Sequence, residues 1–174
     1  MSATKVIITH ETSTPRALPI ISISNELLNR LHLPSDLPLM LRFTGQRVYV
    51  SCQAHQKQDN LVIMPQDVAT KLHIPDQSRL HLSYDAVKKE INLGPVLAIL
   101  VSQVSTQKPP FADLNQFSEE LIQVARKKHI FAYVVSLAEI AKGGHSVYGW
   151  TYTNKGWKRK QMPIPQILYN RISS

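Results

Sequence analysis

The feature that most constrains the fold of this chain is an internal repeat in its first half. Residues 21–43 recur, with changes, at 62–84, an offset of 41 residues. The best-matched positions are Leu31-His32-Leu33-Pro34 against Leu72-His73-Ile74-Pro75, and Leu39, Leu41 and Phe43 against Leu80, Leu82 and Tyr84. A period of this length indicates a duplicated supersecondary unit. The first half is therefore expected to fold as two copies of one unit.

Each copy is predicted to be a small ββαβ-type unit. An apolar strand leads into a short helix that begins at Ser24 in the first copy and at Pro65 in the second. Proline is tolerated at a helix start, where its missing N–H has no intrahelical partner, and it interrupts a helix interior. Pro34 and Pro75 therefore end the two helices. The strands that follow alternate apolar and polar residues with the period of two that a half-buried strand requires.

Two such units can pair the sheet edges that one unit leaves open. We therefore predict a pseudo-twofold β-barrel of the double-psi type over residues 15–93, preceded by an N-terminal arm over residues 1–14. Similar units also form dimeric DNA-binding proteins, which need a strongly basic face. Residues 1–95 carry 10 basic and 8 acidic residues, and a net charge of only +2 argues against DNA binding. A structural or partner-docking barrel is the preferred interpretation. His32 and His73 are copies of one repeat position, so a metal site that joins them is not expected.

The second half has a different architecture. Gly94-Pro95 marks the boundary, and residues 94–174 are predicted to form a small parallel α/β domain. The expected elements are strands at 96–101 and 130–136, helices at 114–128 and 137–141, a hairpin of 147–153 and 157–161, and a last strand at 166–169. The first strand, helix and second strand make a βαβ unit, whose strands are parallel. Gly143-Gly144-His145 could contact a phosphate, but a turn is the preferred interpretation.

The second half is also more basic than the first, with 10 basic and 4 acidic residues, a net charge of +6. The candidate basic surface is on the hairpin, beside Trp150 and Trp157: Lys155, Lys158, Arg159 and Lys160. Basic groups beside aromatic rings suit single-stranded nucleic acid. Strand alternation, however, places Trp157 on the face opposite Lys158, so a core-facing tryptophan with a solvated outer face is the alternative.

No catalytic constellation is recognisable in this sequence, and no metal-ligand spacing. Phosphate-loop, dinucleotide-binding, zinc-protease and serine-hydrolase motifs are absent from it. The single cysteine, Cys52, excludes an internal disulfide and fits a reducing compartment. The sequence shows no signal peptide and no apolar stretch that could span a membrane. A cytoplasmic protein without a membrane partner is therefore expected.

Ordered short motifs in residues 94–172 provide a further guide. They are Gly94-Pro95-Val96-Leu97-Ala98-Ile99-Leu100, Pro110-Phe111, Phe117, Tyr133-Val134, Gly149-Trp150, Gly156-Trp157 and Pro163-Ile164-Pro165-Gln166-Ile167-Leu168-Tyr169-Asn170-Arg171-Ile172. This series resembles the front part of the YheC/YheD family, ATP-grasp proteins of spore-forming bacteria that are often described as endospore coat-associated. Ala98 stands where this family commonly has glycine, and Gln166 where it commonly has aspartate.

The resemblance implies that residues 94–172 are a pre-ATP-grasp subdomain that shapes the substrate side of a cleft. The ATP-grasp module, with its phosphate-binding lysines and Mg²⁺-binding acidic residues, would begin after Ser174. This chain would then hold neither cofactor, and only the longer protein would be an ATP-dependent ligase. Asn170 and Arg171 are the substrate- or nucleotide-adjacent candidates, because they end a strand of a parallel sheet, where ligands collect. A salt bridge to a helix or domain interface is the alternative for Arg171.

Three hypotheses therefore stand at this point. The first is a non-catalytic N-terminal region, barrel plus pre-ATP-grasp subdomain, whose partner is the missing ATP-grasp module and whose location is cytoplasmic or spore-associated. The second is a basic nucleic-acid-binding protein that uses the tryptophan hairpin. The third is a spore-coat scaffold whose barrel docks other coat proteins.

Overall fold

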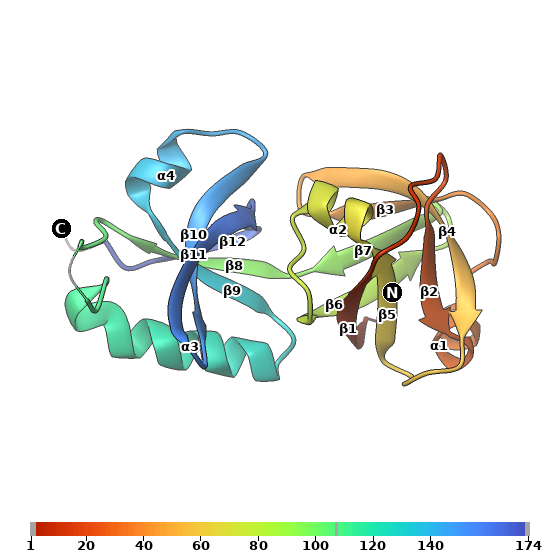
Figure 1. Cartoon of the computed structure of the whole chain (residues 1–174), viewed down its shortest axis with the longest axis horizontal. Helices are drawn as coiled ribbons and strands as arrows, with labels where there is room; N and C mark the ends of the chain where they lie inside the picture. Colours follow the sequence, from red (N-terminus) through yellow and green to blue (C-terminus); the bar gives the residue numbers. More distant parts are fainter. Residues whose placement is uncertain (1–2, 107, 173–174) are drawn as a thin grey trace. The chain divides into compact units, whose positions relative to one another are not determined.

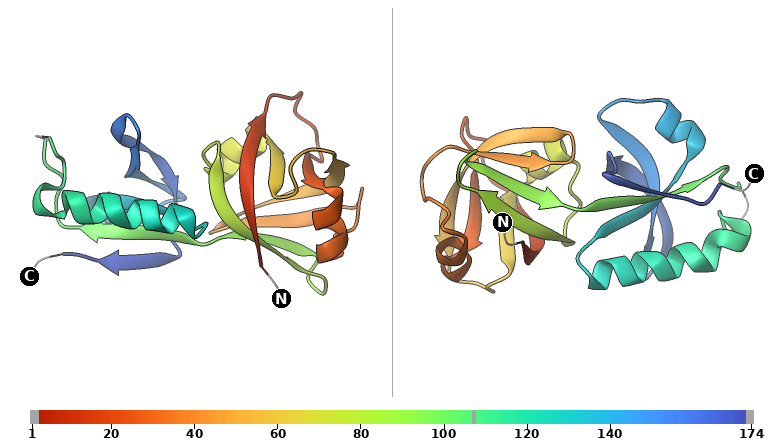
Figure 2. Two further views of the ribbon diagram at one scale, coloured as in Figure 1. Left: turned by 90° about the horizontal axis from the view of Figure 1, so that it is seen from below. Right: turned by 180° about the vertical axis from the view of Figure 1, so that it is seen from behind.

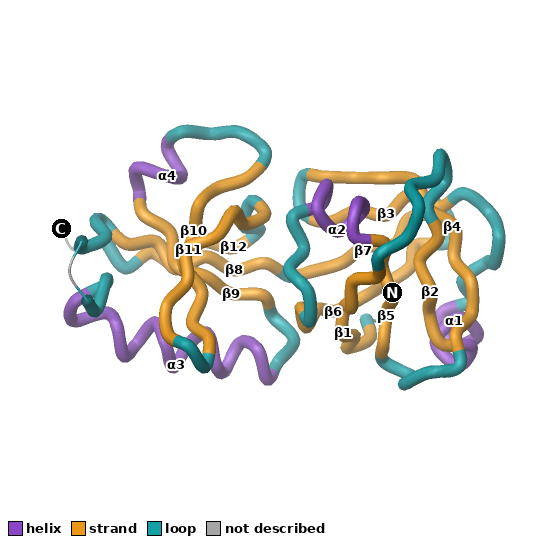
Figure 3. The backbone as a smooth tube through the Cα atoms, in the orientation of Figure 1, coloured by secondary structure: helices purple, strands orange, loops and turns teal. Residues whose placement is uncertain are grey.

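The computed structural model describes residues 3–106 and 108–172. The chain divides between Gly94 and Pro95 into two compact units, which are labelled by element in Figure 1. Strands make up most of both units and the helices are few and mostly short, as Figure 3 shows. None of the helices in the described ranges is long and apolar enough to cross a bilayer.

The described part of the first unit is a closed barrel with the strand order β1-β5-β2-β4-β3-β7-β6, seen from two further sides in Figure 2. Its strands are β1 (Thr4–Glu11), β2 (Ile20–Ser24), β3 (Leu39–Phe43), β4 (Gln46–His55), β5 (Leu61–Pro65), β6 (Ser78–Asp85) and β7 (Glu90–Gly94), and its helices are α1 (Asn25–Leu31) and α2 (Gln66–Leu72). The predicted barrel is confirmed. The arm predicted over residues 1–14 is wrong at β1, which pairs with β5 on one side and β6 on the other.

The strand registers show the pseudo-twofold relation directly. In the parallel pair of β1 and β5, Ile7 lies opposite Leu61, and in the parallel pair of β4 and β2, Ser51 lies opposite Ile20. Leu61 and Ile20 are 41 residues apart, whereas Ser51 and Ile7 are 44 apart. The repeat therefore includes β1, which matches β4 with a different offset because the loop between β1 and β2 is three residues longer than the loop between β4 and β5.

The helix ends repeat in the same way. Ser24 caps α1 by accepting a hydrogen bond from the Leu27 N–H at 3.1 Å, whereas Pro65 starts α2 without a side-chain cap. His32 and His73 end the helices in the left-handed conformation, with φ of 55° and 57°. This geometry ends a helix by bonding its last carbonyl groups. The copied histidines therefore occupy a backbone position that ends each helix.

The second unit contains a five-stranded sheet with the order β11-β10-β9-β8-β12. Its elements are β8 (Val96–Val101), the 3-10 helix η1 (Ala112–Leu114), α3 (Asn115–Lys127), β9 (Phe131–Ser136), α4 (Leu137–Ala141), β10 (Ser146–Thr153), β11 (Gly156–Pro163) and β12 (Ile167–Asn170). The strands β12, β8 and β9 are parallel, as predicted. The sheet as a whole is mixed, because the hairpin of β10 and β11 joins β9 in antiparallel pairing.

Two groups of buried side chains hold this sheet together. Helix α3 contributes Ile122 and Ala125 to a core with Ile99 and Val134 of the sheet; the helix is seen alongside the strands in Figure 2. A separate buried side chain, Tyr133, is fully shielded from solvent and its hydroxyl donates to the Pro163 carbonyl oxygen at 2.6 Å. That bond ties the far end of β11 back to β9.

We expect Gly149→Ala to destabilise the second unit by about 1–3 kcal/mol, the usual cost of overpacking a core. A Cβ at Gly149 would clash with the Tyr133 ring, which is buried and held by its hydroxyl, and would lie 3.1 Å from Met162 Cγ. Urea unfolding followed by tryptophan fluorescence measures the effect, since both tryptophans are in this unit. Gly45→Ala is the control, because an added Cβ there meets nothing within 4 Å. The control should leave the tryptophan-reported transition of the second unit where it is in the unaltered chain, and an unshifted transition in Gly149→Ala would contradict this packing.

We expect the thiol of Cys52 to resist alkylation in the folded protein. The side chain is fully buried in the barrel, and burial raises its pKa to about 12, so very little reactive thiolate exists at pH 8. Because the chain has one cysteine, the labelling rate with iodoacetamide reports on this position alone. Labelling should become fast in denaturing urea. Fast labelling without denaturant would show that the barrel does not enclose Cys52.

Candidate functional site

Asn170 and Arg171 lie at the carboxyl end of β12, as the sequence predicts. Asn170 is opposite Leu100 of β8, and the Arg171 N–H donates to the Leu100 carbonyl oxygen at 2.9 Å. The Asn170 Oδ1 accepts from the Ile172 N–H at 2.9 Å, a local bond just after the end of β12. Both residues are exposed. They are therefore accessible at the edge where parallel strands end.

The guanidinium of Arg171 stacks on a ring of the neighbouring helix. It lies 4.8 Å from the ring centroid of Phe117 in α3, whose other neighbour is the ring of Tyr169 at 5.9 Å. A cation–π contact of this kind contributes about 0.5–1 kcal/mol at an exposed site. The alternative for Arg171 was a salt bridge to a helix. Arg171 does contact helix α3, but through the aromatic ring of Phe117 and not through a carboxylate. This contact holds the guanidinium beside the carboxyl edge without neutralising its charge.

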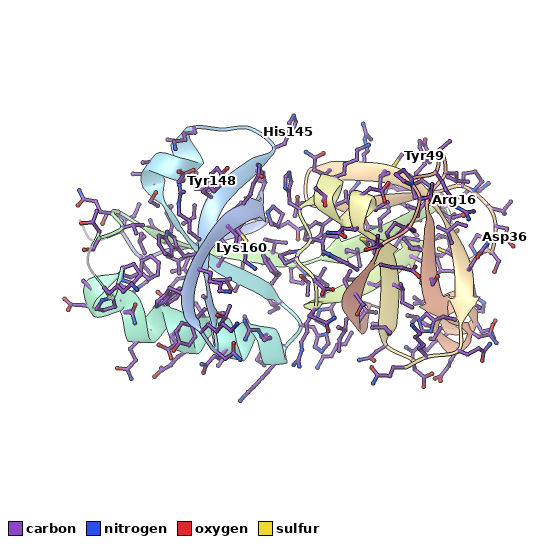
Figure 4. The ribbon with its side chains drawn as sticks, viewed as in Figure 1. Arg16, Asp36, Tyr49, His145, Tyr148 and Lys160 are labelled. Carbon is purple, nitrogen blue, oxygen red and sulfur yellow. The ribbon has the colours of Figure 1, made fainter. Side chains whose placement is uncertain are left out.

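The four basic candidates on the hairpin divide into separate groups. Arg159 is opposite Trp150 in the register, whereas Lys158 is opposite Thr151 and Lys160 is opposite Gly149. Directly paired residues of antiparallel strands share a face, so Lys158 and Lys160 project from the face opposite the tryptophans, as alternation predicts. Lys155 is in the turn, outside the ladder. In Figure 4, Tyr148 and Lys160 mark the two strands of the hairpin.

Arg159 is held in a small charged cluster with Glu139 of α4. The Glu139 carboxylate accepts from Lys142 Nζ at 2.8 Å and from an Arg159 guanidinium nitrogen at 3.1 Å. The hydrogen bond from Lys142, followed by a backbone bond at Tyr148 and the two positive charges, holds the pKa of Glu139 below its usual range. The Arg159 guanidinium also lies 4.6 Å from the centroid of the Tyr148 ring. This arginine connects the hairpin to α4.

The two tryptophans line a pocket with a loop that is distant in sequence. The pocket, of about 480 Å³, lies against Trp150, Trp157 and Lys155 on the hairpin and against residues 105–106 and 108–110 of the loop after β8. Phe111 supports both indoles edge-on, at centroid distances of 6.0 Å to Trp150 and 4.7 Å to Trp157. Sequence reasoning missed the contribution of the loop, because no local pattern connects Lys108 with the hairpin.

A second pocket, of about 250 Å³, lies on the barrel and is bounded mainly by polar groups. It is lined by the longer loop between β1 and β2, including Arg16 (labelled in Figure 4), and by Gln53 of β4. Glu11 and Asp67 bring acidic groups to the same pocket. The extra residues of the loop between β1 and β2 distinguish this side of the barrel from the pseudo-twofold-related side, which has the shorter loop between β4 and β5. The mixture of both charges selects no single class of ligand.

The remaining candidates have backbone roles. Gly143 and Gly144 adopt positive φ of 69° and 105°, and the Gly143 N–H bonds the Ile140 carbonyl oxygen, so the pair forms the turn that ends α4. Over residues 3–106 and 108–172 there is no group of three or more His, Cys, Asp or Glu side chains that could hold a metal. Burial lowers the pKa of His73, which disfavours its charged form.

We expect Arg159→Gln to raise the pKa of Glu139 towards its usual value, because one of the cations that stabilise the carboxylate is removed. Since folding lowers this pKa, the cluster stabilises the second unit above the unfolded pKa of about 4.5, and that stabilisation is lost as the pH falls through the folded value. NMR titration of the Glu139 side chain measures the shift. Lys158→Gln removes the same charge from the opposite face and should leave the titration unchanged; equal effects of the two variants would rule out the contact.

Comparison with known proteins places these features in context. No family model matches the chain. It is similar to the endospore coat-associated protein YheD of Bacillus subtilis (strain 168), with 26% identity over 162 residues that cover 88% of this chain and 34% of YheD. The chain thus spans about a third of the length of the curated relative it matches. The resemblance seen in residues 94–172 is confirmed and extends into the barrel, so the chain has a YheD-like relationship over most of its length.

Proposed function

We propose that this chain is the non-catalytic N-terminal region of a YheD-like ATP-grasp protein with a role in spore formation. The observation that carries the proposal is the match to an endospore coat-associated protein, which covers 88% of this chain and only 34% of the relative. In this proposal the first unit is a double-psi barrel and the second is the pre-ATP-grasp subdomain. The ligase chemistry belongs to a further module, beyond residue 174.

The topology of each unit supports these two assignments. In the barrel, the strands β1 and β4 each begin one copy of the repeat, and each pairs in parallel with the second strand of the opposite copy, β5 or β2. In the second unit, β8, α3 and β9 form a parallel βαβ unit extended by β12. Asn170 and Arg171 then lie at the carboxyl edge of the parallel strands, where a substrate of the longer protein would approach.

We do not expect the second unit to hold a bound Mg²⁺–ATP. The metal needs carboxylate ligands, and the second unit has only four acidic residues, of which Glu139 is already bonded to Lys142 and Arg159. No step of a ligase reaction is therefore assigned to this chain. Under the proposal, ATP and Mg²⁺ are held by the further module.

The exposed apolar side chains of the edge strand β12 support the proposal that a partner covers this strand. Ile167, Leu168 and Tyr169 are 48%, 48% and 44% exposed, on the outermost strand of the sheet. An apolar edge strand exposed in this way is an aggregation hazard unless something covers it. In the proposal the further ATP-grasp module of the same polypeptide provides the cover, with a spore-coat protein as the other partner to consider.

A chimera tests the proposal most directly. Residues 1–174 replace the matching third of YheD in a fluorescent fusion, and spores are imaged for a labelled coat. We expect the chimera to label the coat, whereas a fusion to YheD without this third should label it weakly or not at all. Two variants of the chimera test whether the carboxyl end of β12 matters beyond its positive charge. Arg171→Ala removes the arginine at that end, and Arg126→Ala removes an arginine elsewhere in the second unit. Only Arg171→Ala should lower ATP-dependent ADP release by the chimera. Failure of the chimera to reach the coat would refute the spore link.

Isothermal titration with Mg²⁺–ATP tests the absence of a nucleotide site in this chain. We expect residues 1–174 alone to give no binding heat at millimolar Mg²⁺–ATP and no ADP release, because residues 3–106 and 108–172 hold no group of three or more His, Cys, Asp or Glu side chains that could bind a metal. Mg²⁺-dependent binding with a dissociation constant below about 10 µM, roughly 7 kcal/mol of binding free energy, would show that the chain carries its own nucleotide site. That result would overturn the proposal that ATP and Mg²⁺ bind only to the further module.

The nucleic-acid hypothesis remains a second candidate because the second half has a net charge of +6. The position of Lys158 and Lys160 on the face opposite Trp157 argues against a continuous aromatic and basic surface. This hypothesis requires affinity for single-stranded oligonucleotides that falls steeply between 50 and 200 mM salt. Fluorescence anisotropy over that salt range distinguishes it from the first proposal, which requires no such binding.

A further inference from the structure

The pocket between the hairpin and residues 105–106 and 108–110 has chemistry that the proposed function does not use. Trp150 and Trp157 supply aromatic surface, and Pro109 and Pro110 add apolar rings. Among the described residues that line it, two are lysines, Lys108 and Lys155, and none is acidic. The pocket therefore offers an apolar, aromatic surface and a positive rim.

Hydrogen bonds close the chain at both walls of the pocket. The loop is closed by the Ser105 N–H, which donates to the Pro110 carbonyl oxygen at 2.8 Å. The hairpin turn is closed by Thr153, whose hydroxyl bonds the Gly156 carbonyl oxygen at 3.0 Å and accepts from the Lys155 N–H at 3.2 Å. A preformed pocket loses less entropy on binding than one that must be ordered.

One polar group of a residue that lines this pocket has no partner among the described residues. The indole Nε1 of Trp157 is shielded from solvent and has no hydrogen-bond acceptor within the part of the chain that is described. A buried N–H that stays unpaired costs about 1–3 kcal/mol. Packing alone explains the apolar faces of the tryptophans, which border the core of this unit. It leaves the Nε1 donor without an acceptor among the described residues.

We propose that this pocket binds a small ligand with a flat ring and one anionic group, either a carboxylate or a phosphate. The ring would lie against Trp150 and Trp157, and the anion would contact the ammonium groups of Lys108 and Lys155. The volume of about 480 Å³ is within the range of small-molecule sites. This inference is independent of the proposed ligase, because it requires neither Mg²⁺ nor ATP.

Tryptophan fluorescence of the full chain provides a direct assay, since the chain has two tryptophans and both line the pocket. The probes are phenylacetate and phenyl phosphate, which distinguish the two anions. We expect a saturable change with a dissociation constant of about 0.1–1 mM for at least one of them, the range of a small fragment. Acetate, which lacks the ring, and benzyl alcohol, which lacks the charge, should bind at least about tenfold more weakly.

Matched lysine variants locate the binding. Lys155→Ala should weaken the better probe about tenfold, because a charge-assisted contact is lost, whereas Lys158→Ala, on the opposite face of the same strand pair, should leave it within about twofold. Both lysines are exposed, so both variants are expected to fold. The proposal is overturned if neither probe gives a saturable change up to 10 mM, if benzyl alcohol binds as tightly, or if both variants weaken binding equally.

Discussion

Closure of the barrel is the constraint on which the first unit depends. Every strand edge exposes backbone N–H and carbonyl groups that need partners. One copy of the repeat cannot supply them, but β1 pairs with β5 and β6, and β4 pairs with β2 and β3, so each copy covers edges of the other. The backbone bond from the Gln77 N–H to the Ile8 carbonyl oxygen has its counterpart in the bond from Asp36 to Cys52. The burial of Cys52, and with it the inertness of the thiol, follows from this closure.

The second unit meets the same requirement only in part, because its sheet is open and has two edges. The edge at β11 carries Lys158, Arg159 and Lys160, and charges of this kind discourage pairing with another chain. The edge at β12 carries exposed apolar side chains instead. This difference is why we assign the covering partner to β12 and not to the hairpin. Arg171 adds a positive charge at the end of that strand, held by Phe117.

Local patterns in the sequence predicted most of the elements and few of the long-range contacts. Strand and helix positions followed from periodicity and from cap residues such as Ser24 and Pro65, because these signals act within a few residues. The strand β1 was missed because it matches β4 with an offset of 44, whereas the rest of the repeat has an offset of 41. The mixed sheet differs from the predicted parallel one because the antiparallel hairpin joins β9. The site residues Asn170 and Arg171 were placed by strand direction alone; the contact with Phe117 brings together residues that are distant in sequence.

The pocket beside the tryptophans shows how alternation restricts where a cation can meet an aromatic ring. Within β11, a lysine next to Trp157 must project to the opposite face, so Lys158 cannot reach the pocket. Lys155 can, because it lies in the turn, where the ladder no longer dictates its direction. Lys108 reaches the same place from a loop on another part of the unit. Arg159 does share the tryptophan face within β11, but it is bonded to Glu139 and lies over the Tyr148 ring. Both lysines that line the pocket come from outside the strand.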